Sequence, residues 1–253
     1  MLLILKLTLV PMLVVSVTLA TRRWGARIGG LLTGFPIVTG PALLFFALEQ
    51  GPGFASEAAR AVLVSLVGVA TSSVTYAWAA RRTPWWISLP FSWTSFFMVV
   101  LLVQRVPVTA TAALVLALAS IALAQALLPH AGAHAAGARP AWDLPLRVIA
   151  SMAMVVSVTT LAARLGPTLS GALTPFPVAV SILLGFSHAQ QGSSAAISFL
   201  RGFMPGMWSF AVFCFVLSVG IVALGTAMGF VAALATAVPM QAAVLWWMQR
   251  RSR

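Results

Sequence analysis

Long apolar segments, separated by short polar or basic stretches, recur along the whole chain. A hydrocarbon core of about 30 Å requires roughly 20 apolar residues in a helix that crosses it. Nine segments meet this requirement, and we predict transmembrane helices over residues 2–20, 28–49, 56–79, 84–103, 107–128, 144–163, 168–189, 197–220 and 225–248. Only glycines separate the last two segments, so the boundary between them is the most weakly marked.

The composition agrees with a polytopic membrane protein. Of 253 residues, 61% are hydrophobic and 7% are charged, whereas a soluble domain is about 45–50% apolar and about 25% charged. The formal charge of +12 comes from 15 basic residues that lie singly or in short groups between the apolar segments. This pattern lacks the basic stripe of a nucleic-acid-binding surface, so we expect the lipid bilayer as partner and no nucleic acid.

The basic residues predict the orientation of the chain. If the N-terminus lies on one side, the opposite side receives Arg22, Arg23, Arg27, Arg81, Arg82, Arg139, Arg147, Arg201, Arg250, Arg251 and Arg253. The N-terminal side receives only Lys6, Arg60, Arg105 and Arg164. Cytoplasmic loops are enriched in Lys and Arg. We therefore predict a bacterial inner-membrane protein with an outer N-terminus, a cytoplasmic C-terminus and an odd number of spans, which favours nine over ten.

The chain also contains an internal repeat. Residues 14–51 and 155–192 align without gaps at an offset of 141, and 16 of the 38 aligned positions are identical. The shared features include Thr-x-Phe-Pro, Gln-Gly and a later arginine, which apolar bias alone would not produce. Self-similarity of this kind indicates a repeated architecture.

The spacing of the two copies predicts their relative orientation. Five predicted helices separate equivalent positions, so the copies cross the membrane in opposite directions. We expect an all-α fold of four helices, one linking helix and four inverted helices. The corresponding units are residues 1–103, a linking helix and cytoplasmic loop over 104–143, and residues 144–253.

Helix breakers lie at equivalent places in the two copies. Proline removes a backbone donor and obstructs the preceding turn, and Pro36 and Pro177 both fall within predicted spans. Paired, interrupted spans in inverted repeats are typical of solute sites near the membrane midplane. A simple proline kink in each span is the alternative. The candidate solute-binding residues of these segments are Thr33, Phe35, Pro36, Thr39, Thr174, Phe176, Pro177 and Ser181.

Other polar residues extend the candidate site. We expect Gln50, Gln191, Arg60 and Arg201 toward the cavity mouths, where the arginines would bind an anionic group; snorkelling to lipid headgroups is the alternative. Glu49 and His188 are candidates for proton coupling, against ordinary interfacial or packed roles. Asp143 is interpreted as a residue that starts a helix.

The second half of the chain resembles the small GlpM-like membrane proteins of bacteria. The resemblance rests on "FPVAVSILLGFSHAQQG" followed by "LRGFMPGMWSFAVF" and covers roughly residues 165–248. Residues 24–103 show a weaker similarity to the same proteins. Ser65 stands in the first half where Gly206 stands in the second, so the Gly-Met-Trp-Ser pattern occurs only once. The resemblance implies two such units fused in opposite orientations, and it implies no activity.

The expected function is a secondary transporter or exporter of a small solute, with anionic and zwitterionic solutes included. A structural or assembly protein and a passive channel are the alternatives. The sequence carries no nucleophile elbow, phosphate-binding loop, dinucleotide fingerprint or metalloprotease helix. We therefore expect no enzyme activity, no cofactor and no metal site.

Overall fold

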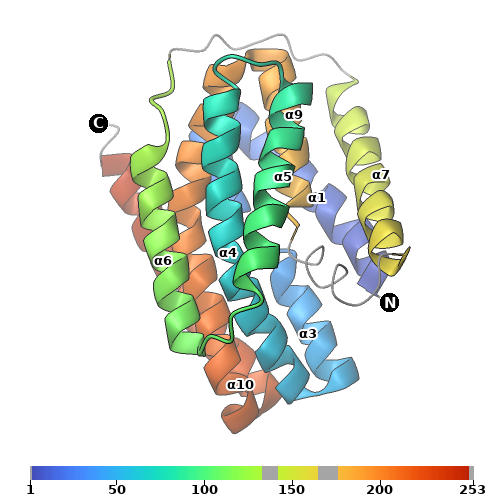
Figure 1. Cartoon of the computed structure of the whole chain (residues 1–253), viewed down its shortest axis with the longest axis vertical. Coiled ribbons are helices and arrows are strands. Elements are labelled where there is room, and N and C mark those ends of the chain that lie inside the picture. The colour runs from blue at the N-terminus through green and yellow to red at the C-terminus, as the bar shows by residue number, and fades with distance from the viewer. Residues whose placement is uncertain (1, 133–141, 165–175, 251–253) are drawn as a thin grey trace.

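The computed structural model describes residues 2–132, 142–164 and 176–250, which form helices joined by loops, with no strand in these ranges (Figure 1). The helices are α1 (Leu2–Trp24), α2 (Ala26–Thr33), α3 (Thr39–Gln50), α4 (Pro52–Ala79), α5 (Trp85–Val103), α6 (Ala110–Leu127), α7 (Asp143–Arg164), α9 (Val178–Gln191) and α10 (Ser193–Arg250). By length and composition, α4, α5, α6 and α10 can each cross a membrane.

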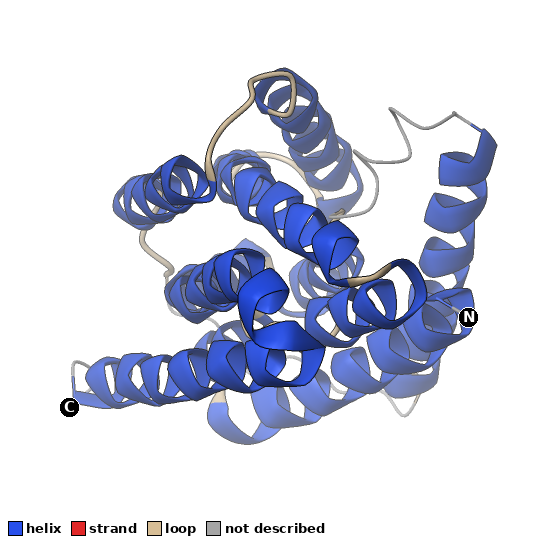
Figure 2. Ribbon diagram, turned by 90° about the horizontal axis from the view of Figure 1, so that it is seen from below, coloured by secondary structure: helices blue, strands red, loops and turns tan. Residues whose placement is uncertain are grey.

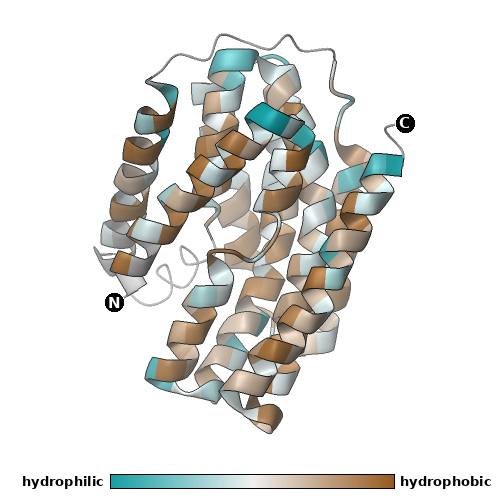
Figure 3. Ribbon diagram, turned by 180° about the vertical axis from the view of Figure 1, so that it is seen from behind, coloured by the Kyte–Doolittle hydropathy of each residue, from teal (hydrophilic) through white to brown (hydrophobic). Residues whose placement is uncertain are grey.

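Large apolar side chains cover the outside of the long helices. Leu102 on α5, Leu123 on α6 and Val222 on α10 are all strongly exposed. Figure 3 shows apolar residues through the middle of the helices and the most hydrophilic residues near helix ends. A soluble protein rarely exposes a continuous apolar surface of this extent, so these helices indicate a membrane protein.

Glycines in a left-handed conformation lie at two helix junctions and at a break inside α10. Gly51 and Gly192, which lie 141 positions apart, have φ values of 90° and 83° at the junctions before α4 and α10. Gly225 has a φ of 78° inside α10. A straight helix of 58 residues would be about 87 Å long, far more than a bilayer. The break at Gly225 lies where the boundary between the last two spans was expected.

The helices form a bundle in which equivalent parts of the sequence repeat pack on each other. Helix α1 packs against α7, α4 packs against α10, and the linking helix α6 contacts both α4 and α10. The view from below in Figure 2 shows the helices grouped into one bundle. The linking helix therefore lies on the outside of the α4–α10 pair.

Small residues allow α2 to approach α10 very closely. A Cβ at Gly30 would overlap the backbone carbonyl of Phe199, and a Cβ at Gly206 would approach the Leu31 carbonyl oxygen to 2.5 Å. Helices that touch through glycines gain backbone van der Waals contact. The short helix α2 is thus held against α10 by direct backbone contact.

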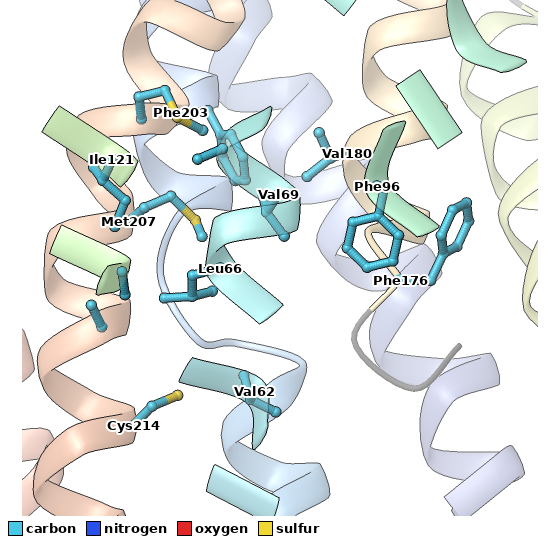
Figure 4. Packing of buried hydrophobic residues seen from close by; sticks show 14 of the residues in the cluster. Val62, Leu66, Val69, Phe96, Ile121, Phe176, Val180, Phe203, Met207 and Cys214 are labelled. Atoms are coloured by element: carbon cyan, nitrogen blue, oxygen red, sulfur yellow. The ribbon is translucent and has the colours of Figure 1, made fainter. Parts of the chain in front are cut away.

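The core lies between α4, α9 and α10. Leu66 and Val69 of α4 face Phe203 and Met207 of α10, while Phe176 lies against Phe96 of α5 (Figure 4). The centre of the bundle is therefore mainly aliphatic and aromatic.

Candidate functional site

The predicted span over residues 28–49 is interrupted at its proline. Helix α2 ends at Thr33 and α3 begins at Thr39. Across the break, the Gly40 amide donates to the Pro36 carbonyl at 2.8 Å, and the Ile37 amide donates to the Phe35 carbonyl at 2.8 Å. These local bonds satisfy part of the backbone that the break frees, as buried backbone groups require.

The equivalent segment of the second copy is described from Phe176 onward. Pro177 has φ −80° and ψ 66°, outside the helical region, and α9 begins at Val178. The Val178 amide donates to the Phe176 carbonyl at 2.9 Å, as the Ile37 amide does to the Phe35 carbonyl. Thr174, the predicted partner of Thr33, lies outside the described residues.

Both segments line one cavity of about 150 Å³. Helices from both halves of the chain contribute its wall, which consists of Val10, Leu13, Thr33, Phe35, Val38, Thr39, Val69, Val155, Val158, Phe176, Pro177, Val178, Ala179, Val180, Phe203, Met207 and Phe210. Of the eight candidates in the two proline segments, Thr33, Phe35, Thr39, Phe176 and Pro177 lie in this wall. Pro36 is buried outside it.

The wall of the cavity is apolar except for two hydroxyl groups. Among the described residues that form it, no side chain is charged. The Thr33 hydroxyl donates to the Gly29 carbonyl at 2.8 Å within α2, and its oxygen keeps lone pairs that can accept a further hydrogen bond. Thr39 supplies the second hydroxyl at the start of α3. The cavity can therefore surround a small apolar body and contact it at two polar points.

An aromatic cluster holds the second segment against α5. The ring of Phe176 stacks on Phe97 with a centroid separation of 5.2 Å and meets Trp93 and Phe96 edge-on at 5.7 Å. The Ser181 hydroxyl accepts from Trp93 Nε1 at 3.0 Å and donates to the Pro177 carbonyl at 3.0 Å. Ser181 thus stabilises the first turn of α9 and does not line the cavity, contrary to its predicted place.

The two repeat-related arginines lie away from this cavity. Arg60 forms an ion pair with Glu57 and donates to the Val108 carbonyl at 3.0 Å, just before α6. Arg201 donates to the carbonyls of Leu128 and Pro129 at 3.1 and 3.2 Å, just after α6. The expected position at the cavity mouths is therefore corrected. These guanidinium groups bind backbone carbonyls that flank the two ends of α6.

The remaining candidates also lie outside the central cavity. Glu49 and Gln50 are exposed at the end of α3, so the buried carboxyl that the proton-coupling hypothesis requires is absent at Glu49. His188 lies near the end of α9, where its Nδ1 is 3.1 Å from the hydroxyl of the fully buried Tyr76. Gln191 lines a second, smaller cavity, which also contains a group of charged residues.

Three charged residues and one glutamine form a group that we call the charge cluster: Arg22 on α1, Asp143 and Arg147 on α7, and Gln190 on α9. Sequence reasoning did not predict this group. Asp143 accepts from Arg22 at 2.6 Å, from Arg147 at 2.7 Å and from Gln190 at 2.6 Å. The Gln190 side-chain oxygen accepts from Arg147 at 3.3 Å. Asp143 is 2% exposed and Arg147 is 3% exposed. The cluster joins the ends of three helices from both halves of the chain.

The carboxylate of Asp143 is held in its ionised form by its partners. Asp143 precedes the predicted span over residues 144–163. Burial alone would raise its pKa, but the hydrogen bonds from Gln190, Arg147 and Arg22 outweigh burial and lower the pKa below its ordinary value. The one signal in the sequence was the i, i+4 spacing of Asp143 and Arg147, which places opposite charges on one helix face.

A second missed contact involves the glutamine of the last predicted span. Gln241 donates through Nε2 to the Leu31 carbonyl at 2.8 Å and accepts from the Ser209 hydroxyl at 2.6 Å. Leu31 lies in the last turn of α2, and its carbonyl also accepts from the Gly34 amide at 3.2 Å. An amide side chain on α10 therefore adds a second hydrogen bond to the carbonyl at the end of α2.

No protein-family model, curated protein or solved structure matches the chain. The functional argument consequently rests on the cavity, the two proline segments and the charge cluster.

Proposed function

We propose that this protein is a secondary transporter or exporter of a small solute in the bacterial inner membrane. The observation that carries the proposal is the cavity of about 150 Å³, which is lined by the proline segment of each repeat copy. Irregular backbone within a membrane is tolerated where it is buried in protein or lines a wet cavity. In secondary transporters, such paired interruptions lie at the solute site.

Alternating access between two inverted repeats is the proposed mechanism. It is supported by the ungapped repeat, by the matching glycine junctions at Gly51 and Gly192, and by the contacts of α1 with α7 and of α4 with α10. In the proposed topology nine spans place the N-terminus outside and the C-terminus in the cytoplasm. Transport then requires the two proline segments to open first toward one side and then toward the other.

The lining of the cavity favours a solute with a small apolar body. Phenyl rings and valines form most of the wall, and Thr33 and Thr39 add two hydroxyls. An engineered apolar cavity of about 150 Å³ binds benzene, which sets the approximate size. An anionic or zwitterionic solute would have to place its charge outside the described part of the wall, because burying an unpaired charge is very costly.

The proposal predicts that transport depends on the Thr33 hydroxyl. A screen of small solutes against the purified protein, read as a rise in the unfolding midpoint, would first identify a ligand. Uptake of that ligand into proteoliposomes should fall about fivefold in Thr33→Val, because one neutral hydrogen bond contributes about 1 kcal/mol.

Thr71→Val is the matched control for this experiment. The Thr71 hydroxyl also donates to a carbonyl of its own helix, that of Val67 at 2.9 Å, and Thr71 does not line the cavity. The control should transport at the rate of the unaltered protein. Unchanged uptake by Thr33→Val, or an equal loss in both variants, would contradict a solute site at the proline segments.

A further inference from the structure

The charge cluster surrounds a cavity of its own. The cavity has a volume of about 20 Å³ and is lined by Thr18, Thr21, Arg22, Asp143, Arg147, Leu183, Ser187, Gln190, Gln191 and Phe199. It is bounded by α1, α7, α9 and the start of α10. None of these residues lines the central cavity, so the two cavities are separate features.

The lining of this smaller cavity has an excess of positive charge. Two arginines face one aspartate, so the lining carries one net positive charge; Arg147 is paired with Asp143 and buried, whereas the Arg22 side chain is 27% exposed. Arg147 is 3% exposed, and its guanidinium lies 4.8 Å from the centre of the Phe186 ring. Buried charges in proteins are normally paired. The lining therefore favours a monovalent anion.

Several donors around the cavity have no acceptor among the residues that the structure describes. Arg147 has five N–H groups, of which Nε donates to Asp143 and Nη2 donates to Gln190. Ser187 is 4% exposed, yet its hydroxyl has no hydrogen-bond partner among the described residues. The buried Thr21 hydroxyl likewise has no partner there. A fully buried hydroxyl without a partner, such as that of Thr21, is rare in native structures, and the Thr21 and Ser187 hydroxyls belong to residues that line one net-positive cavity.

The volume of the cavity decides which anion fits. A cavity holds one water molecule when about 10–15 Å³ is accessible to it, so about 20 Å³ accommodates one species of similar size. A monatomic halide has this size, whereas phosphate or a lipid headgroup carries several oxygens and would require the helices to separate. We propose that this cavity binds a single halide ion, chloride under cellular conditions, through Arg147, Arg22 and the hydroxyl of Ser187.

This inference does not depend on transport and can be tested without a known solute. The purified full-length protein would be titrated with potassium chloride against potassium gluconate at constant ionic strength. A ligand that binds only the folded state raises the unfolding midpoint, so chloride should produce a saturable rise. Equal midpoints in chloride and gluconate would overturn the proposal.

Two further probes separate a halide from larger anions. Inorganic phosphate, and phosphatidylglycerol added to the micelles, should each leave the midpoint in gluconate unchanged. A rise with either probe that equals the rise with chloride would overturn the assignment to a halide. Crystals soaked in bromide should give an anomalous peak next to Arg147 and Ser187, and a peak only elsewhere would contradict the site.

Ser187→Ala is the decisive variant. Because the hydroxyl has no partner among the described residues, the variant should unfold at the normal midpoint in gluconate. Its apparent affinity for chloride should be at least about tenfold weaker, since it lacks one hydrogen bond to a charged group.

The matched control is Ser151→Ala, which removes a buried hydroxyl that donates to the Val148 carbonyl within α7, outside the small cavity. It should bind chloride normally. Equal chloride affinity in Ser187→Ala and in the unaltered protein would overturn the role given to Ser187.

Discussion

The central cavity and the charge cluster differ in how many polar side chains they contain and in whether those side chains bond to each other. The cavity lies between the break from α2 to α3 and the start of α9, and its described wall has two hydroxyls and no charged side chain. The charge cluster lies at intact helix ends, and its carboxylate accepts three side-chain hydrogen bonds. Removal of a hydroxyl from the cavity wall therefore removes few polar contacts, whereas a change in the cluster leaves buried charges without partners.

This difference assigns separate tasks to the two regions. The side chains of the charge cluster bond mainly to each other and hold three helices together. The two hydroxyls of the central cavity keep bonding capacity for a solute. We therefore expect stability to depend mainly on the charge cluster and transport to depend mainly on the cavity wall.

The largest effect is expected for Asp143→Asn. The substitution keeps the shape of the side chain but leaves Arg147 and Arg22 without their counter-charge. Removal of one partner from a buried ion pair typically costs about 3–5 kcal/mol. Denaturant titration of the purified protein in micelles would measure the loss in free energy of unfolding.

Glu57→Gln provides the control for this prediction. Its ion pair with Arg60 has similar chemistry, but the Glu57 side chain is 66% exposed. Exposed pairs contribute about 0–1 kcal/mol, so this variant should unfold almost normally. Equal losses in the two variants would refute the distinction between the buried cluster and a surface pair.

An intermediate effect is expected where α2 meets α10. In Gly30→Ala the new methyl group overlaps the Phe199 carbonyl, and overpacking typically costs about 1–3 kcal/mol. In Gly53→Ala the methyl group meets nothing within 4 Å, and alanine is the better helix former by about 1 kcal/mol. The two variants should change the free energy of unfolding in opposite directions, and a shared direction would contradict close backbone packing of α2.

The smallest effect on stability is expected for Thr39→Val. Thr39 lines the cavity at the start of α3, and substitutions away from committed contacts usually change stability by less than about 0.5 kcal/mol. Transport should nevertheless fall severalfold, because the solute loses a polar contact. Normal transport combined with a clear loss of stability would show that Thr39 supports the fold and not transport, which would contradict the role given to the cavity wall.

The sequence contained the signals for the interrupted helix and much less for the charge cluster. Pro36 favours a break because proline removes a backbone donor and obstructs the preceding turn, although Pro11, Pro90, Pro205 and Pro239 lie inside helices. Local chemistry therefore allowed a break or a kink at Pro36, and the structure shows the break. The contact of Arg22 with Asp143 joins residues 121 positions apart, and its partners depend on how α1, α7 and α9 pack.

The contacts of Arg60 and Arg201 likewise depend on helix packing and were not predictable from the sequence. The repeat aligns the two arginines with each other, but their contacts lie at the two ends of α6, which lies outside the repeat. Ser181 was recognised as a hydroxyl beside a proline, and only the packing of Trp93 shows that this hydroxyl is already bonded. Local irregularity can be predicted from sequence, whereas the partners of long polar side chains are set by tertiary packing.

Access to the cavity from both sides of the membrane tests the central claim most directly. Thr39→Cys would be introduced together with Cys214→Ala, which removes the buried native thiol, and exposed to a membrane-impermeant thiol reagent. Leu123→Cys, on the exposed apolar face of α6, serves as a control that should not react from either side. Alternating access predicts labelling of Thr39→Cys both in right-side-out cells and in inside-out vesicles. Labelling from one side only, or from neither, would contradict transport through this cavity.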